Sequence, residues 1–115
     1  MAEDCLFCKI AAGEIPSERV YSDDDFYAFR DISPAAPAHV LIVPRKHIPR
    51  VTDAGPGDAE LLGRMVLKAN AIAEQEGLTG KGFRYVVNCG EWGGQTVWHV
   101  HLHILGGRTL QWPPG

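Results

Sequence analysis

The chain has 115 residues, enough for one domain with a modest hydrophobic core. Hydrophobic residues make up 45% of it and charged residues 22%, the balance of an ordinary globular protein. Its formal net charge of −3 gives no electrostatic basis for binding a nucleic acid polymer or an anionic membrane, so any phosphate must be bound by a few local groups.

The first stretch, MAEDCLFCKI, has neither a basic region nor the apolar core of a signal peptide. No apolar run approaches the roughly 20 residues that a membrane span needs. We therefore expect a cytoplasmic protein. Its three cysteines are an odd number, which argues against a disulfide framework.

The first half of the chain predicts one short helix and three strands. Residues 4–13 are typical of a short helix closed by a glycine. Residues 18–23 and 26–31 are short strand candidates on either side of an acidic turn. Residues 39–47 form the clearest early strand, and Pro44 either ends it or marks a sheet edge.

The second half begins with a turn at 52–58 and one long helix from about Asp58 to Glu76. The helix shows apolar residues at spacings of three and four: Leu62, Met65, Val66, Ala69, Ile72 and Ala73. Gly77 is typical of the position just after a helix.

Two strands are predicted next, at 83–88 and 97–105, separated by a glycine-rich loop. Residues 107–115 are expected to form an irregular tail. The order of helix, three strands, helix and two strands predicts an α+β domain, with an antiparallel five-stranded sheet and the helices packed on one face.

Three of the five histidines alternate along the last strand, at His99, His101 and His103. Side chains at every second position of a strand share one face, so these imidazoles should lie together. The intervening residues should then face the core: Val100, Leu102 and Ile104. From the residues alone, three interpretations remain: a solvated polar face, a metal site, or acid–base and nucleophilic chemistry near neutral pH.

The run HVHLH and the apolar pair after it resemble the motif His-φ-His-φ-His-φ-φ of the histidine-triad (HIT) superfamily of nucleotide hydrolases and transferases. Further segments resemble the Hint branch of that superfamily, the purine nucleoside phosphoramidases: KIAAGEIPS, AFRDISPAAPAHVLIVPRKHI, LLGRM, VVNCG, GGQTVWHVHLHILGGR and WPPG. Together they cover nearly the whole chain in order. The resemblance implies a single HIT domain over 1–115, with one long and one short helix, and a two-fold homodimer.

The resemblance also implies roles for the histidines. His101 would attack the α-phosphate of AMP or GMP joined to an amine, as in AMP-lysine, and water would hydrolyse the nucleotidyl-histidine. His103 and His39 would contact phosphate oxygens and assist proton transfer, because an amine leaves poorly without a proton. His99 completes the triad.

Two further sets of residues match substrate contacts of the family. Asp31 would accept the ribose hydroxyls while Ile32 covers a base face, although sequence alone favours reading Asp31 as a turn residue before Ser33-Pro34. Asn88 would lie near the ribose and phosphate, or simply start a loop.

The loop GGQT precedes the triad strand. Gly94 lets the backbone approach a phosphate, and Gln95 and Thr96 can donate hydrogen bonds to its oxygens. The family more often has serine at the position of Thr96, and the hydroxyl is kept. Trp112 lies in the tail, which is either a frayed terminus or a segment that crosses the dimer to the partner's leaving-group site.

Cys5 and Cys8 lie one helical turn apart, which suits a redox pair, two inert thiols or half of a tetrahedral zinc site. The resemblance implies that His47 and His99 would complete a structural zinc site. Other members of the branch lack the cysteines, so no cofactor is expected to be required for catalysis.

Other functions compatible with the same nucleophile are hydrolysis of dinucleoside polyphosphates or other nucleotidyl esters, and nucleotide binding by an adaptor with vestigial catalysis. The endings GGR and WPPG favour the phosphoramidase. The complete triad argues against vestigial catalysis. A zinc-dependent hydrolase is disfavoured, because the expected zinc ligands leave His101 free.

Overall fold

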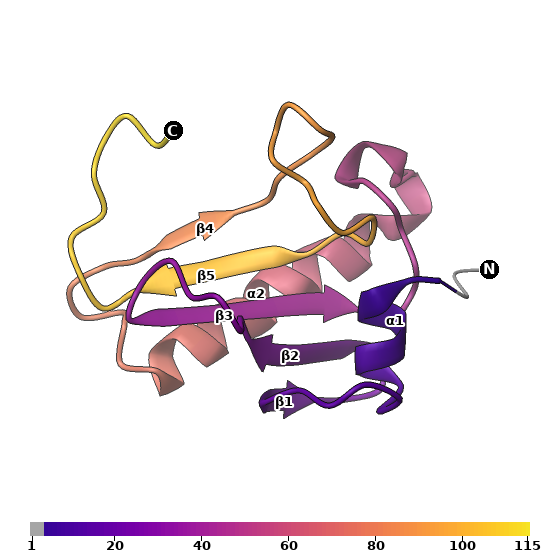
Figure 1. Cartoon of the computed structure of the whole chain (residues 1–115), viewed down its shortest axis with the longest axis horizontal. Coiled ribbons are helices and arrows are strands. Elements are labelled where there is room, and N and C mark those ends of the chain that lie inside the picture. The colour runs from indigo at the N-terminus through magenta and orange to yellow at the C-terminus, as the bar shows by residue number, and fades with distance from the viewer. Residues whose placement is uncertain (1–3) are drawn as a thin grey trace.

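The computed structural model describes residues 4–115 (Figure 1). Its elements in chain order are α1 (Leu6–Ala11), β1 (Arg19–Ser22), β2 (Phe26–Arg30), β3 (Ala38–Pro44), the single-turn 3-10 helices η1 (Val51–Asp53) and η2 (Pro56–Asp58), α2 (Ala59–Gln75), β4 (Arg84–Val86) and β5 (Leu102–Gly106). The predicted order of helices and strands is confirmed, and so is the α+β class. Within 4–115 no helix is both long and apolar enough to cross a membrane.

The sheet is antiparallel with the strand order β1-β2-β3-β5-β4, so β3 and β5 lie next to each other near its middle. In their register His39 is paired with Leu105, and Leu41 is paired with His103. Since every second residue of a strand shares a face, this pairing brings His39 and His103 to one face as diagonal neighbours. Two histidines 64 positions apart in the sequence thereby meet.

The long helix α2 covers the other face of the sheet. Its apolar stripe packs on alternate residues of the central strands, and the shared core includes Phe26, Ala28, Val40, Ile42, Met65, Ala69, Ile72, Leu102 and Ile104. Leu102 and Ile104 therefore face the α2 core as predicted. Val100 is buried but lies outside that cluster.

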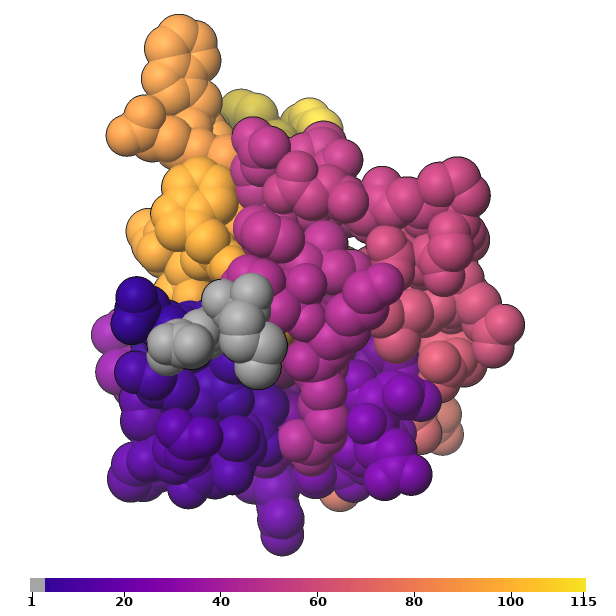
Figure 2. All heavy atoms as spheres, turned by 90° about the vertical axis from the view of Figure 1, so that its right-hand side faces the viewer, coloured from indigo at the N-terminus to yellow at the C-terminus, as the bar shows by residue number. Residues whose placement is uncertain are grey.

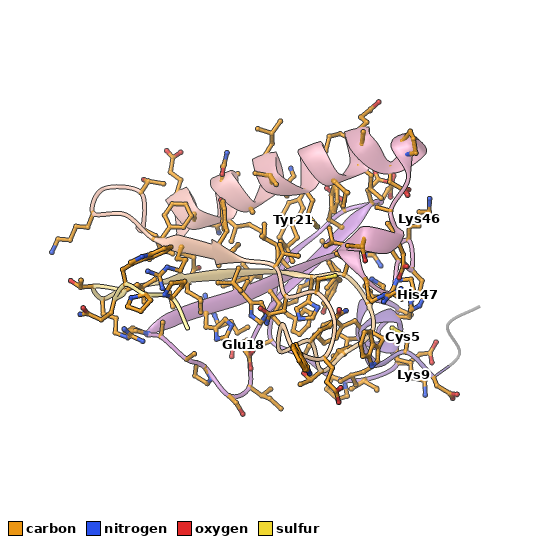
Figure 3. The ribbon with its side chains drawn as sticks, turned by 90° about the horizontal axis from the view of Figure 1, so that it is seen from above. Cys5, Lys9, Glu18, Tyr21, Lys46 and His47 are labelled. Atoms are coloured by element: carbon orange, nitrogen blue, oxygen red, sulfur yellow. The ribbon has the colours of Figure 1, made fainter. Side chains whose placement is uncertain are left out.

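The short helix α1 lies on the opposite face from α2, so the expectation that both helices share one face is wrong. Figure 3 shows the two helices on either side of the sheet. The second core combines α1 with the remaining residues of β2 and β3: Phe7, Ile10, Tyr27, Phe29, Leu41 and Val43. Both strands are apolar almost without interruption, which is typical of strands buried on both faces.

The last strand starts later than predicted, at Leu102, since the β3–β5 ladder stops at the pair Ile42–Leu102 and residues 97–101 lie outside it. In this segment the Val100 N–H donates to the carbonyl of Ile48, at 2.6 Å. His99 and His101 therefore lie in an irregular segment that is bonded to the loop after β3. β4 is also shorter than the predicted strand at 83–88.

Candidate active site and metal cluster

His101 is buried, and its ring is held in one tautomer. Its Nδ1 lies 2.7 Å from the main-chain oxygen of His99. A carbonyl oxygen can only accept, so Nδ1 carries the proton and donates it, and Nε2 of the neutral ring carries the lone pair. Burial lowers the pKa of His101, and the hydrogen bond to His99 and the nearby Asp31 carboxylate offset part of that effect. The site therefore holds a neutral imidazole with a nucleophilic nitrogen.

His39 and His103 form a hydrogen-bonded pair whose tautomers follow from one backbone donor. The Ala35 N–H donates to His39 Nδ1 at 3.0 Å, so the proton of the neutral His39 ring is on Nε2. That N–H points at His103 Nδ1, 2.9 Å away, which leaves the proton of neutral His103 on its Nε2. Nε2 of His103 is buried and has no hydrogen-bond partner among the described residues.

A buried donor without an acceptor is costly, and it points to a ligand that supplies one. The His103 ring lies beside the His101 ring, with centroids 4.9 Å apart. An N–H donor and a nucleophilic nitrogen are thus placed on neighbouring rings. Burial lowers the pKa of His39 and lowers the pKa of His103 to about 4, so the pair is neutral at pH 7.

Asp31 follows β2 and lies next to this pair, with Oδ2 at 3.5 Å from His39 Nε2. Its Oδ1 accepts the Ser33 N–H at 2.8 Å, which is the turn predicted from the sequence. The carboxylate is partly open to solvent and can accept further hydrogen bonds. The next residue, Ile32, is 96% exposed.

The glycine-rich loop at 89–96 is tied down by Gln95, which is buried. The Gln95 Oε1 accepts the Gly90 N–H at 2.9 Å, and its Nε2 donates to the carbonyls of Pro49 and Val97 at 2.6 and 3.1 Å. Both side-chain amide hydrogens are therefore bonded within the protein. Figure 2 shows this loop, in orange, projecting at one edge of the surface.

The other predicted substrate-binding residues lie in or beside the glycine-rich loop, except for Trp112 in the tail. Gly94 has φ +90, a left-handed conformation that favours glycine, and the Asn88 side chain lies beside it. Thr96 is exposed at the end of the loop. Trp112 is 78% exposed, and the guanidinium of Arg84 on β4 lies 6.0 Å from its ring centroid.

The sequence-predicted metal ligands meet in one cluster, which we call the Cys2His2 cluster: Cys5, Cys8, His47 and His99. Figure 3 shows Cys5 of the α1 region and His47, which follows β3, close together at one end of the sheet. His99 Nδ1 lies 3.3 Å from Cys5 Sγ, 3.5 Å from Cys8 Sγ and 3.2 Å from His47 Nδ1. Cys8 Sγ lies 3.6 Å from His47 Nδ1.

These separations fit a tetrahedral zinc ion, whose bond lengths place the ligand atoms about 3.3 to 3.8 Å apart. His99 Nε2 donates to the carbonyl of Pro44 at 2.7 Å, so its Nδ1 lone pair faces the cluster, the usual second hydrogen bond of a metal-binding histidine. Burial and the adjacent Cys5 raise the pKa of the Cys8 thiol to about 11. At neutral pH this thiol therefore becomes a thiolate only when a cation binds beside it.

A second group of candidate ligands, Asp31, His39 and His103, does not fit a metal. A neutral histidine that ligates through Nε2 must carry its proton on Nδ1. His39 Nδ1 accepts the Ala35 N–H instead, which puts the proton on Nε2. This group is a hydrogen-bonded network.

The sequence analysis missed Phe7, whose ring meets the His101 ring edge-on at a centroid distance of 4.9 Å. It also packs on Phe29, 5.4 Å away. The available signal was an apolar residue between two cysteines, three positions before buried Ile10. The backbone donor at Ala35 and the acceptor at Pro44 had no sequence signal.

Comparison with known proteins identifies this arrangement. Residues 12–110 match the HIT domain family. The chain is 52% identical over 110 residues to the purine nucleoside phosphoramidase of Escherichia coli K12, covering 96% of this chain and 92% of that protein. An uncharacterized HIT-like protein of Synechococcus elongatus is 51% identical over the full length of both chains.

Solved structures agree with the sequence comparisons. A HIT family hydrolase from Legionella pneumophila has a TM-score of 0.95 and 52% identity, covering 96% of this chain and 99% of that one. A histidine triad protein from Clostridium difficile has a TM-score of 0.93 and 45% identity, covering 96% of each chain. The chain therefore belongs to the HIT domain family. It is a hydrolase of that family.

The lowered pKa of His103 predicts how stability depends on pH. An unfolded histidine takes up a proton near pH 6.5, whereas folded His103 resists it down to about pH 4. The unfolded state therefore binds more protons in this window, and the free energy of unfolding falls as the pH drops from 6.5 to 4. In His103→Asn, Oδ1 can still accept from His39 but nothing titrates, so the fall should be smaller. Urea unfolding at several pH values measures the free energy of unfolding of both proteins. An equal dependence on pH in the wild type and in His103→Asn would contradict the lowered pKa of His103.

Proposed function

We propose that this chain is a purine nucleoside phosphoramidase, which cleaves the P–N bond of AMP or GMP amides through a nucleotidyl intermediate on His101. The observation that carries the proposal is the opposite hydrogen-bonding state of two adjacent rings: the Nε2 lone pair of His101 and the buried Nε2–H of His103. The Escherichia coli relative, named for this activity, supports it.

In the first step, His101 Nε2 forms a bond to the α-phosphorus while the bond from phosphorus to the amine nitrogen breaks. The electron pair of the broken bond stays on the amine, which must gain a proton to leave. The negative charge of a bound phosphoramidate favours uptake of one proton by the His39–His103 pair, and Asp31 also raises the pKa of His39. The added proton enters at His39 Nδ1 in place of the Ala35 hydrogen bond, and the His39 Nε2 proton shifts to His103 Nδ1. His103 Nε2 then gives its own proton to the amine, which leaves the pair neutral.

In the second step, water attacks the phosphorus and the bond to His101 Nε2 breaks, which releases the nucleoside monophosphate. The His39–His103 pair, neutral again, accepts the proton of the water. His101 Nδ1 stays bonded to the His99 carbonyl, so Nε2 recovers its lone pair for the next turnover. Every group used is an imidazole, and no cofactor takes part.

The same geometry supports the substrate contacts. The partly open carboxylate of Asp31 accepts ribose hydroxyls, and Ile32 is free to cover a base face. Asn88, Gly94 and Thr96 would border the phosphate, while Gln95 holds their loop in place. A hydrolase of dinucleoside polyphosphates would share the nucleophile, but its phosphate leaving group needs no proton, so the donor on His103 favours the amide substrate.

We also propose that the Cys2His2 cluster binds a structural zinc ion. Four ligands, two of them thiols, suit a closed tetrahedral site. Bound there, the metal supplies a cross-link between α1, the loop after β3 and the segment before β5. The ligands do not include His101, so the metal takes no part in the proposed steps.

A two-fold homodimer is the proposed assembly. β4 is an edge strand of the sheet, and apolar side chains near it and on α2 are exposed: Val66, Leu67 and Val87. The tail contacts the first residue of β4, where the Arg84 guanidinium donates to the Gln111 carbonyl at 2.7 Å. From this edge, Trp112 would lie beside the active site of a partner and touch the leaving group.

The nucleophile is tested by replacement. His101→Gly and His101→Asn should lower kcat by at least about a thousandfold, because no bond to phosphorus can form, and should leave AMP binding largely intact. Turnover is measured on a panel of adenosine phosphoramidate, AMP-lysine, a dinucleoside polyphosphate and a phosphodiester, with and without a chelator. Glu74→Ala, on the exposed side of α2, is the control. Wild-type turnover by His101→Gly would refute the mechanism.

Elemental analysis should find about one zinc ion per chain in protein purified without chelator. The double variant Cys5→Ser, Cys8→Ser should lose it, and should lose stability more than activity, with Tm falling by about 5 °C or more. Cys89→Ser is the matched control, since this thiol lies outside the cluster beside Thr52 and its replacement should keep both metal and Tm. Protein without metal would refute the zinc site.

Deletion of residues 111–115 tests the tail. AMP binding should persist, because the nucleotide contacts lie elsewhere, while the ranking of phosphoramidates that differ only in their amine should change. The measurement is kcat/KM for a series of amines at fixed dimer concentration, with Trp112→Ala as a point-variant comparison. An unchanged ranking in a truncated dimer would mean that the tail only packs.

A further inference from the structure

His99 lies at the junction between the Cys2His2 cluster and the nucleophile. Its ring is fully buried, and Nδ1 faces the three other cluster residues while Nε2 donates to Pro44. Its main-chain oxygen is the acceptor that holds His101 Nδ1–H, at 2.7 Å. One residue thus contacts the metal cluster through its side chain and the nucleophile through its backbone.

The peptide unit that joins His99 to Val100 is held at both ends. Its carbonyl accepts from His101, and its N–H donates to the carbonyl of Ile48 at 2.6 Å. Ile48 directly follows His47, another residue of the cluster. The unit thus begins at one ligand, His99, and its N–H is bonded to the residue after another ligand, His47. A bond from each of these two histidines to one ion would therefore fix the position of the unit.

The strand ladder does not provide this restraint. β5 begins at Leu102, so the peptide unit lies outside the sheet hydrogen bonds. At the cluster, His47 Nδ1 and His99 Nδ1 face each other at 3.2 Å.

We propose that His99 is a positioning residue through which metal binding at the Cys2His2 cluster fixes the orientation and tautomer of His101. This inference rests on the proposed nucleophilic role of His101 and adds to the metal a catalytic consequence beyond stability. The chemistry itself needs no metal, so the metal-free protein keeps part of its activity. Loss of metal releases the 99–100 peptide unit, and His101 Nδ1–H loses a fixed acceptor.

The experiment compares zinc-loaded protein with protein freed of metal by a chelator. Long-range proton–nitrogen NMR reports the tautomer of each histidine ring, and His101→Asn identifies the signals of His101. The loaded protein should show only the Nδ1–H tautomer, whereas the metal-free protein should show a mixture with Nε2–H. With adenosine phosphoramidate, kcat should fall about tenfold on metal removal, KM should change less than about threefold, and added zinc should restore both.

Ile72→Val is the matched control, because it removes a buried methyl group from the α2 core on the opposite face of the sheet. It should lower stability while keeping the His101 tautomer and kcat. An unchanged tautomer and kcat in the metal-free protein would overturn the inference, and so would an equal loss of kcat in Ile72→Val. Loaded protein that leaves phosphoramidates intact refutes the proposed function instead, and the tautomer measurement still decides the role of His99.

Discussion

The hydrogen bond from His101 Nδ1 to the main-chain oxygen of His99 is the interaction on which the site depends. A buried neutral imidazole can present either nitrogen as its lone pair, and this bond selects Nε2. It requires that the main chain before β5 leave the sheet, because a carbonyl inside the ladder would be paired with a strand. The β3–β5 ladder meets that requirement because it stops at the pair Ile42–Leu102, two residues before β3 ends at Pro44, which has no N–H to donate.

A similar logic fixes the other two imidazoles from a single backbone donor. The Ala35 N–H determines the proton position on His39, and His39 in turn determines it on His103. This series of hydrogen bonds ends at the buried Nε2–H of His103, for which the described residues provide no acceptor. The proton positions on this face are therefore set by a main-chain group, which side-chain substitution cannot remove.

Much of this could be predicted from the sequence. The order of the elements, the long helix and the meeting of Cys5 and Cys8 with His47 follow from periodicity and from the family resemblance. The hydrogen bonds that orient the histidines were missed, because they use main-chain groups that carry no sequence signal. The acceptor at Pro44 and the donor at Ala35 are backbone atoms, whose use depends on tertiary placement. The face chosen by α1 was also missed, since β2 and β3 are apolar on both sides and give no preference.

The two-sided burial of β3 has a consequence for how the protein can change. Its successive side chains pack alternately against the α2 core and against the α1 core, and His39 begins the second series. Any substitution from Val40 to Val43 therefore changes the packing of one core directly and displaces the backbone that it shares with the other core. Protein interiors are packed as densely as organic crystals, so neither core can absorb such a change easily. Few substitutions in β3 should therefore be tolerated, in natural or in directed evolution. New substrate preferences should arise instead from substitutions in the loops around it.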